Sequence, residues 1–182
     1  MTVARQWTLV AIILAGLALG AAALVKFSPE QVGAAVGDHA PDFRVVNIAT
    51  GDTVALHDRY HGAVTLVNIW ATWCVPCKVE MPSMEKLYRD LGPRGLKIAA
   101  VSIDEGDPTD VRNFAAQLGL SFDILQDRTT GIQQAYQTTG VPESFLLNRD
   151  GVIVKRVIGA HDWNSDVNRG LVERLLAERG GR

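Results

Sequence analysis

Hydrophobic and polar residues are distributed differently at the start of this chain than in the rest of it. Residues 7–25 form a run of 19 residues without a charged side chain, between Arg5 and Lys26. As a helix this run reaches about 28 Å, close to the thickness of the hydrocarbon core of a membrane. We expect residues 1–26 to be an uncleaved membrane anchor. A cleavable signal peptide ending near residues 21–23 is the alternative, and both interpretations export the remainder of the chain.

After a predicted spacer over residues 27–38, apolar runs alternate between the period of a strand and that of a helix. The predicted strands cover residues 43–48, 53–56, 64–71, 96–103, 122–126, 144–148 and 152–158. The predicted helices cover residues 74–91, 109–118, 132–137 and 163–179.

Turn and capping residues support these boundaries. Residues 50–52 and 149–151 each combine an aspartate with a glycine between two strand-like runs, which is typical of β-hairpins. Asp107 followed by Pro108 is a helix start, and Gly119 is the corresponding stop. We expect Asp162 to cap the last helix and Gly180-Gly181 to end it. The pattern predicts one α/β domain over residues 39–182, with helices on both faces of a mixed sheet. Element order alone leaves several α/β folds open.

The balance of charged side chains excludes one class of partner. The chain carries 18 basic and 20 acidic side chains, and without Arg5 and Lys26 the exported part has 16 basic and 20 acidic. This balance offers no basic surface, so we expect no nucleic-acid partner.

The only two cysteines, Cys74 and Cys77, lie where a buried strand is predicted to end and a helix to begin. A thiolate is the nucleophile in disulfide exchange, and the first turn of a helix favours negative charge. We therefore expect Cys74 to be the nucleophile and Cys77 to be the resolving thiol. A structural zinc site would need a second pair of ligands, and covalent haem attachment would need histidine where Lys78 stands. A purely structural disulfide would close a very small loop and add little stability.

Residues 70–77, Trp70-Ala71-Thr72-Trp73-Cys74-Val75-Pro76-Cys77, resemble the active-site signature of the thioredoxin superfamily. They are particularly similar to the membrane-anchored TlpA, ResA and CcmG (DsbE) group, and the resemblance extends from residue 37 to the last helix. It implies a thioredoxin-like fold with an N-terminal β-hairpin extension and a central insertion, preceded by one transmembrane helix. Pro82 matches the proline inside the active-site helix of this superfamily.

The same resemblance implies a substrate surface. Residues 140–142, Gly140-Val141-Pro142, are similar to the loop that carries a cis-proline and faces the redox pair. A cis-proline would present the backbone of Val141 to an extended substrate segment beside Cys74, and would keep a metal-binding side chain out of that position. The residues expected to contact substrate are Trp73, Val75, Pro76, Val141 and Pro142.

Two acids are candidates for tuning the thiols. General reducing thioredoxins carry a buried aspartate six residues before the first cysteine, and here that position is Asn68. Glu80 matches a glutamate of the ResA and CcmG groups, and Glu143 follows the proposed cis-proline. A nearby carboxylate would raise the pKa of the thiols or act as a base toward Cys77. Each glutamate is otherwise interpreted as an ordinary surface acid.

The resemblance also implies a function. Such a protein reduces disulfides outside the cytoplasm of a bacterium, held to the inner membrane by a single span. The expected substrate is apocytochrome c, and the expected electron donor is a membrane thiol carrier of the CcdA or DsbD type. No organic cofactor and no metal are implied, and the four histidines show no ligand spacing.

Three other functions stay open. A TlpA-like reductase would serve assembly of the copper centre of cytochrome oxidase. A thiol peroxidase is suggested by residues 40–43, Ala40-Pro41-Asp42-Phe43, which also occur in peroxiredoxin-like sequences. A Cu(I)-binding module would use the same two cysteines without catalysis.

Overall fold

The computed structural model of the chain describes residues 7, 12–17, 20 and 34–178. The chain divides into two compact units, Met1–Gln31 and Val32–Arg182. The predicted anchor and its alternative cleavage site lie largely outside the described residues. Within the part that is described, no helix has both the length and the apolar character needed to cross a membrane.

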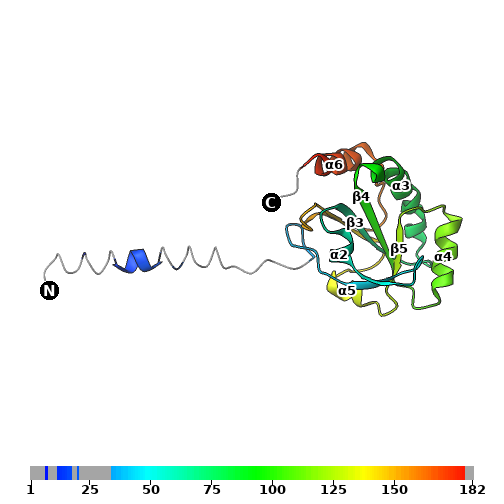
Figure 1. Cartoon of the computed structure of the whole chain (residues 1–182), viewed down its shortest axis with the longest axis horizontal. Helices are drawn as coiled ribbons and strands as arrows, with labels where there is room; N and C mark the ends of the chain where they lie inside the picture. Colours follow the sequence, from blue (N-terminus) through cyan, green and yellow to red (C-terminus); the bar gives the residue numbers. More distant parts are fainter. Residues whose placement is uncertain (1–6, 8–11, 18–19, 21–33, 179–182) are drawn as a thin grey trace. The chain divides into compact units, whose positions relative to one another are not determined.

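The second unit is built on a single mixed sheet of seven strands (Figure 1). The strands are β1 (Arg44–Asn47), β2 (Thr53–Ala55), β3 (Val64–Trp70), β4 (Leu96–Ser102), β5 (Asp123–Gln126), β6 (Glu143–Leu147) and β7 (Ile153–Ile158). The helices are α2 (Leu56–Tyr60), α3 (Val75–Leu91), α4 (Pro108–Gln117), α5 (Gly131–Ala135) and α6 (Asp166–Ala177), with a short 3-10 turn, η1 (Gly92–Arg94), after α3. The strand order is β2-β1-β5-β4-β3-β6-β7.

Strand β3 is the centre of the fold, and every one of its residues is buried. It pairs in parallel with β4 and antiparallel with β6, so its backbone is bonded on both edges. Because side chains alternate along a strand, β3 supplies two different faces of the core. Trp70 meets Phe114 of α4 on one face, with ring centroids 5.0 Å apart. Phe145 of β6, which is paired with Val67, meets Tyr136 after α5 on the other face.

The predicted thioredoxin-like architecture is confirmed for the described residues. The hairpin β1–β2 extends the sheet at one edge, with Val46 opposite Thr53 across the predicted turn. Helix α4 and strand β5 form the central insertion, and β5 pairs in parallel with β4. The Asp107 side chain caps α4 by accepting the Thr109 N–H at 2.7 Å. Gly119, at φ +63°, follows this helix, as predicted.

The last helix begins later than the sequence pattern predicted. Helix α6 starts at Asp166, with Ser165 as its N-cap, instead of near Trp163. Asp162 closes a turn instead, because its carboxylate accepts the Asn164 N–H at 2.9 Å and its carbonyl accepts the Asn168 amide at 2.6 Å. This turn directs Trp163 into the core, where it is fully buried. The predicted stop at Gly180-Gly181 lies outside the described residues.

Part of the predicted spacer packs against the sheet. The Gly37 N–H donates to the carbonyl of Ile153, and the Ile153 N–H donates to the carbonyl of Asp38, both at 2.9 Å. Ala34 is buried. The two hydrogen bonds attach residues 37–38 to the first residue of β7.

Candidate functional site

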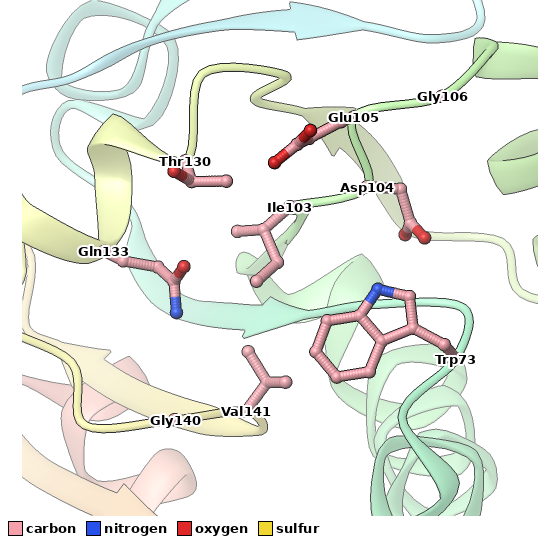
Figure 2. A pocket seen from close by; sticks show the side chains of 9 residues that line it. All are labelled: Trp73, Ile103, Asp104, Glu105, Gly106, Thr130, Gln133, Gly140 and Val141. Carbon is pink, nitrogen blue, oxygen red and sulfur yellow. The ribbon is translucent and has the colours of Figure 1, made fainter.

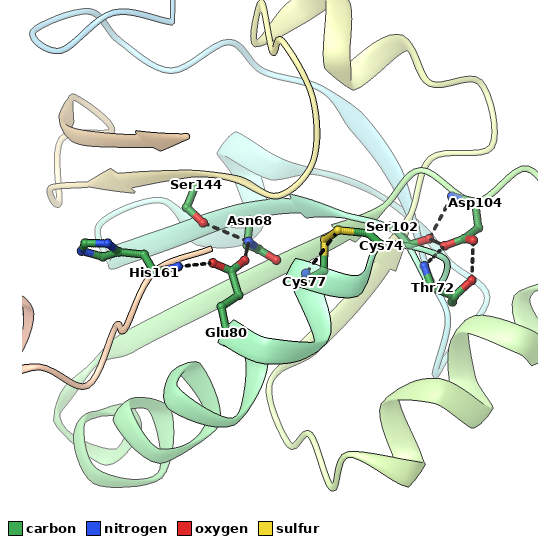
Figure 3. The surroundings of a disulfide bond; sticks show 9 residues. All are labelled: Asn68, Thr72, Cys74, Cys77, Glu80, Ser102, Asp104, Ser144 and His161. Carbon is green, nitrogen blue, oxygen red and sulfur yellow. Dashed lines mark hydrogen bonds between the residues drawn. A yellow bond between two sulfur atoms is a disulfide. The ribbon is translucent and has the colours of Figure 1, made fainter. Parts of the chain in front are cut away.

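The redox pair lies at the junction between β3 and α3. Cys74 is the N-cap of α3 and is joined to Cys77 by a disulfide, with 5.3 Å between their Cα atoms. The N–H of Cys77 donates to Sγ of Cys74 at 3.2 Å (Figure 3). Exposed N–H groups and the helix dipole favour negative charge at this position, so a Cys74 thiolate would be stabilised there. Cys77, one turn further, is completely buried.

The residues around the pair divide into an exposed rim and a buried floor. Trp73 is 66% exposed and Val75 is 69% exposed, and Pro76 is exposed beside them. Val79 extends this apolar rim along α3. Trp70 is fully buried in the core. The rim is therefore available to another molecule, whereas Trp70 is not.

The peptide bond between Val141 and Pro142 is cis, as the family resemblance implied. Pro142 is buried and Val141 is half-buried. The backbone N–H and C=O of Val141 form no hydrogen bond within the described part of the chain. They are therefore free to pair with an added strand.

A pocket of about 690 Å³ opens between the redox loop and this segment. Trp73 lines one side, Gly140 and Val141 line another, and Ile103 also contributes to its lining (Figure 2). Asp104 and Glu105 give its rim an acidic part. The pocket lies beside the exposed apolar residues of the redox loop and includes the segment whose backbone groups are free.

Glu80 is the acid closest to the dithiol along α3, three residues after Cys77, and it is only 2% exposed. Its Oε1 accepts the side-chain amide of Asn68 at 2.7 Å, and its Oε2 accepts the His161 N–H at 3.2 Å. Both of these partners are neutral groups. Burial raises the pKa of Glu80 to about 7, and the two hydrogen bonds oppose this shift only in part. The interpretation of Glu80 as a surface acid is wrong, because its carboxyl group lies inside the protein.

Asn68 organises this buried network. Its amide nitrogen donates to Glu80 and, at 2.9 Å, to Oγ of Ser144 on β6. Its carbonyl oxygen is buried and has no hydrogen-bond partner among the described residues. Figure 3 shows this oxygen on the side of the amide that faces Cys77. Asn68 thus connects Glu80 of α3 to Ser144 of β6, beside the resolving thiol Cys77.

Glu143 occupies a different environment from the one that its sequence position suggested. It is paired with Ile69, whereas Ser144 is paired with Asn68, so Glu143 and Asn68 point to opposite faces of the sheet. Its carboxylate is fully buried and accepts the Arg156 Nε–H at 2.6 Å and the Thr139 N–H at 3.0 Å. It is not a surface acid, and among the described contacts it has none with either cysteine.

Asp104 is a residue at this site that sequence reasoning missed. Its Oδ2 accepts the Thr72 N–H at 2.9 Å and the Ser102 hydroxyl at 2.6 Å, and its Oδ1 accepts the Thr72 hydroxyl at 2.6 Å. The carboxylate thereby joins the end of β4 to the loop that precedes Cys74. Its position just after a buried parallel strand was the available signal, because functional side chains gather at the carboxyl ends of such strands.

No group of three or more histidine, cysteine, aspartate or glutamate side chains is arranged to hold a metal ion in the described ranges.

Comparisons with known proteins agree with the geometry of this site. A model of the Redoxin family matches residues 35–171. The thiol-disulfide oxidoreductase ResA of Geobacillus kaustophilus is 37% identical over 155 residues, which cover 85% of this chain and 86% of that protein. ResA of Bacillus anthracis is 35% identical over 151 residues, covering 83% and 85%. Among solved structures, a candidate thiol:disulfide interchange protein DsbE from Chlorobium tepidum has a TM-score of 0.65 at 27% identity, covering 79% of this chain and 96% of that one.

Proposed function

The chain belongs to the Redoxin family and is a thiol–disulfide oxidoreductase, and on that premise we propose that it reduces disulfides in proteins outside the cytoplasmic membrane. The observation that carries this proposal is the pair itself. Cys74, 3% exposed, caps a helix beside an exposed apolar rim, and Cys77 is fully buried one turn before Glu80, whose hydrogen-bond partners among the described residues are neutral groups. This arrangement separates a nucleophile from a resolving thiol.

The reaction begins with the dithiol form. The Cys74 thiolate attacks one sulfur of the substrate disulfide, that S–S bond breaks, and the second substrate sulfur leaves as a thiolate that takes up a proton. The Cys77 thiol then loses its proton and its sulfur attacks Sγ of Cys74. The mixed disulfide breaks, and the substrate sulfur that Cys74 had attacked leaves as a thiolate and is protonated. The substrate has gained two electrons and two protons, and the protein has become the Cys74–Cys77 disulfide.

Glu80 is suited to accept the proton from Cys77. A carboxyl group with a pKa of about 7 is divided between its two protonation states near neutral pH, which is the range in which a base is most effective. Glu80 lies one helical turn after Cys77, so both side chains lie on the buried face of α3. Asn68 and the His161 N–H hold the carboxylate in place.

The substrate is proposed to bind as an extended segment. The free backbone groups of Val141 would pair with it, while Trp73, Val75 and Pro76 would cover its apolar side chains. This contact would hold a substrate disulfide next to Cys74. Pro142 shapes the loop that carries Val141.

The proposed substrate is apocytochrome c, whose two haem-binding cysteines must be reduced before haem is attached. A membrane dithiol carrier of the CcdA or DsbD type would return the protein to its reduced form. The uncharged segment over residues 7–25 supports placement of the domain on the outer side of a bacterial cytoplasmic membrane, held by a single span. The resemblance to the TlpA, ResA and CcmG group supports the choice of substrate.

Trapping of partners tests the proposal. Cys77→Ser should accumulate mixed disulfides on Cys74 in cells, because the resolving thiol is absent. Cys74→Ser should capture no partner and should have no reductase activity. Recovery of apocytochrome c in the Cys77→Ser adducts is the expected result. Adducts with a protein of copper-centre assembly would transfer the role to that pathway, and trapping that requires Cys77 in the absence of Cys74 would contradict the division of labour.

A further inference from the structure

Among the residues that the structure describes, three glutamates are buried, and each has different partners. Glu80 contacts only neutral groups, as described above. Glu85, on α3, is bonded to Arg89 at 2.5 Å and to the N–H and hydroxyl of Ser121 at 2.8 and 2.7 Å. Glu143 is bonded to Arg156 and to the Thr139 N–H. Thr139 directly precedes Gly140 and Val141, which line the pocket.

Arg156 connects Glu143 to further parts of the same region. While its Nε donates to Glu143, its Nη2 donates to the carbonyl of Gln137 at 2.8 Å and its Nη1 donates to the carbonyl of Ala34 at 3.2 Å. The guanidinium lies over the ring of Phe145, 5.2 Å from its centroid. One arginine on β7 therefore uses the donor geometry of its planar head on three separate acceptors.

These bonds hold both ends of one loop. Residues 137–143 begin at Gln137, whose carbonyl is held by Arg156, and end at Glu143, whose carboxylate is held by the same arginine. The Glu143 carboxylate reaches back to the Thr139 N–H in the first half of the loop. Gly140 and Val141, between these anchors, form one wall of the pocket in Figure 2. Arg156 and Glu143 therefore contact both ends of the loop that forms this wall.

We propose that Glu143 and Arg156 form a positioning pair, which holds the loop over residues 137–143 so that Val141 can bind an extended protein substrate. The inference rests on the proposed function. It assigns Glu143 to substrate binding, whereas the sequence had placed it with the acids that tune the thiols. The pair lies on the face of the sheet opposite Glu80, and its two charges cancel. We therefore expect it to have little effect on the pKa values of the thiols, which Glu80 and the helix N-terminus would set.

Glu143→Gln is the decisive variant. The carboxylate presents one acceptor oxygen to Arg156 and the other to the Thr139 N–H. A glutamine offers only one acceptor oxygen, so its NH₂ group must face one of these two donors. The loop has to shift to relieve that contact, although the change in side-chain volume is small.

The experiment uses the pre-reduced protein in single-turnover reactions with two oxidised substrates. One is a synthetic peptide with a disulfide in a Cys-X-X-Cys-His segment, and the other is the small aromatic disulfide dithionitrobenzoate. For Glu143→Gln, the half-saturating peptide concentration should rise about tenfold, the equivalent of one lost charge-assisted hydrogen bond. The rate with the small disulfide and the pH dependence of thiol alkylation should match those of the wild type.

Two matched variants make the result specific. Glu85→Gln removes another buried glutamate that is paired with an arginine, and it should leave peptide saturation unchanged. Glu80→Gln should shift the macroscopic thiol titration to lower pH, because it removes a negative charge near the dithiol, without weakening peptide saturation. Arg156→Lys retains the charge but reaches fewer acceptors, and it should weaken peptide saturation by a smaller factor than Glu143→Gln. It also provides a second variant if Glu143→Gln does not fold.

A downward shift of the thiol titration in Glu143→Gln would overturn the inference and return this residue to the tuning of the thiols. Peptide saturation equal to wild type in Glu143→Gln and Arg156→Lys would overturn it as well. Failure of the proposed function is distinguishable from both outcomes, because the wild-type protein would then leave the peptide oxidised while still reacting with the small disulfide.

Discussion

At the scale of single residues, the environment of Glu80 sets it apart from the other buried glutamates. Glu85 and Glu143 each contact an arginine, while Glu80 contacts only the amide of Asn68 and a backbone N–H. Neutral donors compensate for only part of the free energy lost when a carboxylate leaves water. The acid thus keeps a proton at a higher pH than usual, which suits it for exchange with Cys77.

This environment makes stability depend on pH in a defined direction. The pKa of Glu80 is about 7 in the folded protein and near 4.5 when the chain is unfolded, so the folded state binds more protons between these values. The free energy of unfolding should therefore fall as pH rises from about 4.5 to 7, by about 3 kcal/mol, and should stay low above pH 7.

Glu80→Gln should abolish that loss, because glutamine does not ionise. In the oxidised protein the stability of Glu80→Gln relative to the wild type should rise by about 3 kcal/mol between pH 4.5 and pH 8, on top of a constant cost because its NH₂ group faces one of the two donors. Urea unfolding at the two pH values measures the difference, with Glu85→Gln as the control for the loss of a buried glutamate. Parallel stability profiles for the wild type and Glu80→Gln would show that burial does not hold Glu80 protonated.

At the scale of elements, the redox loop is held by contacts on both sides. The carbonyl of Trp70 accepts the Ile103 N–H at 2.9 Å, and Asp104 accepts the Thr72 N–H and hydroxyl. The end of β3 is thereby tied to the end of β4 immediately before the helix that Cys74 caps. The position of Cys74 depends on this junction as well as on α3.

Asp104→Ala should therefore destabilise the protein. It removes the acceptor of three hydrogen bonds, one of which comes from a backbone N–H. A hydrogen bond to a charged group contributes about 1.5–3 kcal/mol to the free energy of unfolding. We expect a net loss of about 2 kcal/mol in the free energy of unfolding, because water reaches part of the site. Asp104→Asn retains an acceptor oxygen and should lose less. Equal stability of Asp104→Ala and the wild type in urea unfolding would show that the junction holds without this carboxylate.

At the scale of the whole molecule, the proposed function requires the folded unit to lie outside the cytoplasm. The described domain carries its own core, built around side chains as large as Trp70, Trp163 and Phe145. A working dithiol of this kind needs an electron donor on the same side of the membrane as its substrates. The uncharged run over residues 7–25 is the feature of the sequence that would place it there.

Reporter fusions check this placement. Alkaline phosphatase joined after Phe27 should be active, since the enzyme acquires its disulfides only in an oxidising compartment. The same reporter joined after Arg5, before the uncharged run, should be inactive. An inactive fusion after Phe27 would contradict export, and a native protein that begins near Leu24 would indicate a cleaved signal peptide instead of an anchor.

The sequence alone determined most of the elements and the chemistry of the redox pair. Periodicity identified β3, α3 and β4 closely, because buried strands and an amphipathic helix leave patterns in adjacent residues. The spacing of Cys74 and Cys77, and the position of Pro142, depend on local motifs. The start of α6 was misplaced because Asp162 is equally suited to a turn and to a helix cap.

Only the tertiary structure decided what the acids do. Both Glu80 and Glu143 are buried, but Glu80 on α3 meets the face of the sheet that carries Asn68, whereas the register of β6 against β3 places Glu143 on the opposite face. One then meets the amide of Asn68 and the other meets Arg156, which lies on β7. The charge state and role of a buried carboxyl group depend on partners that are distant along the chain, and no local pattern of residues records those partners.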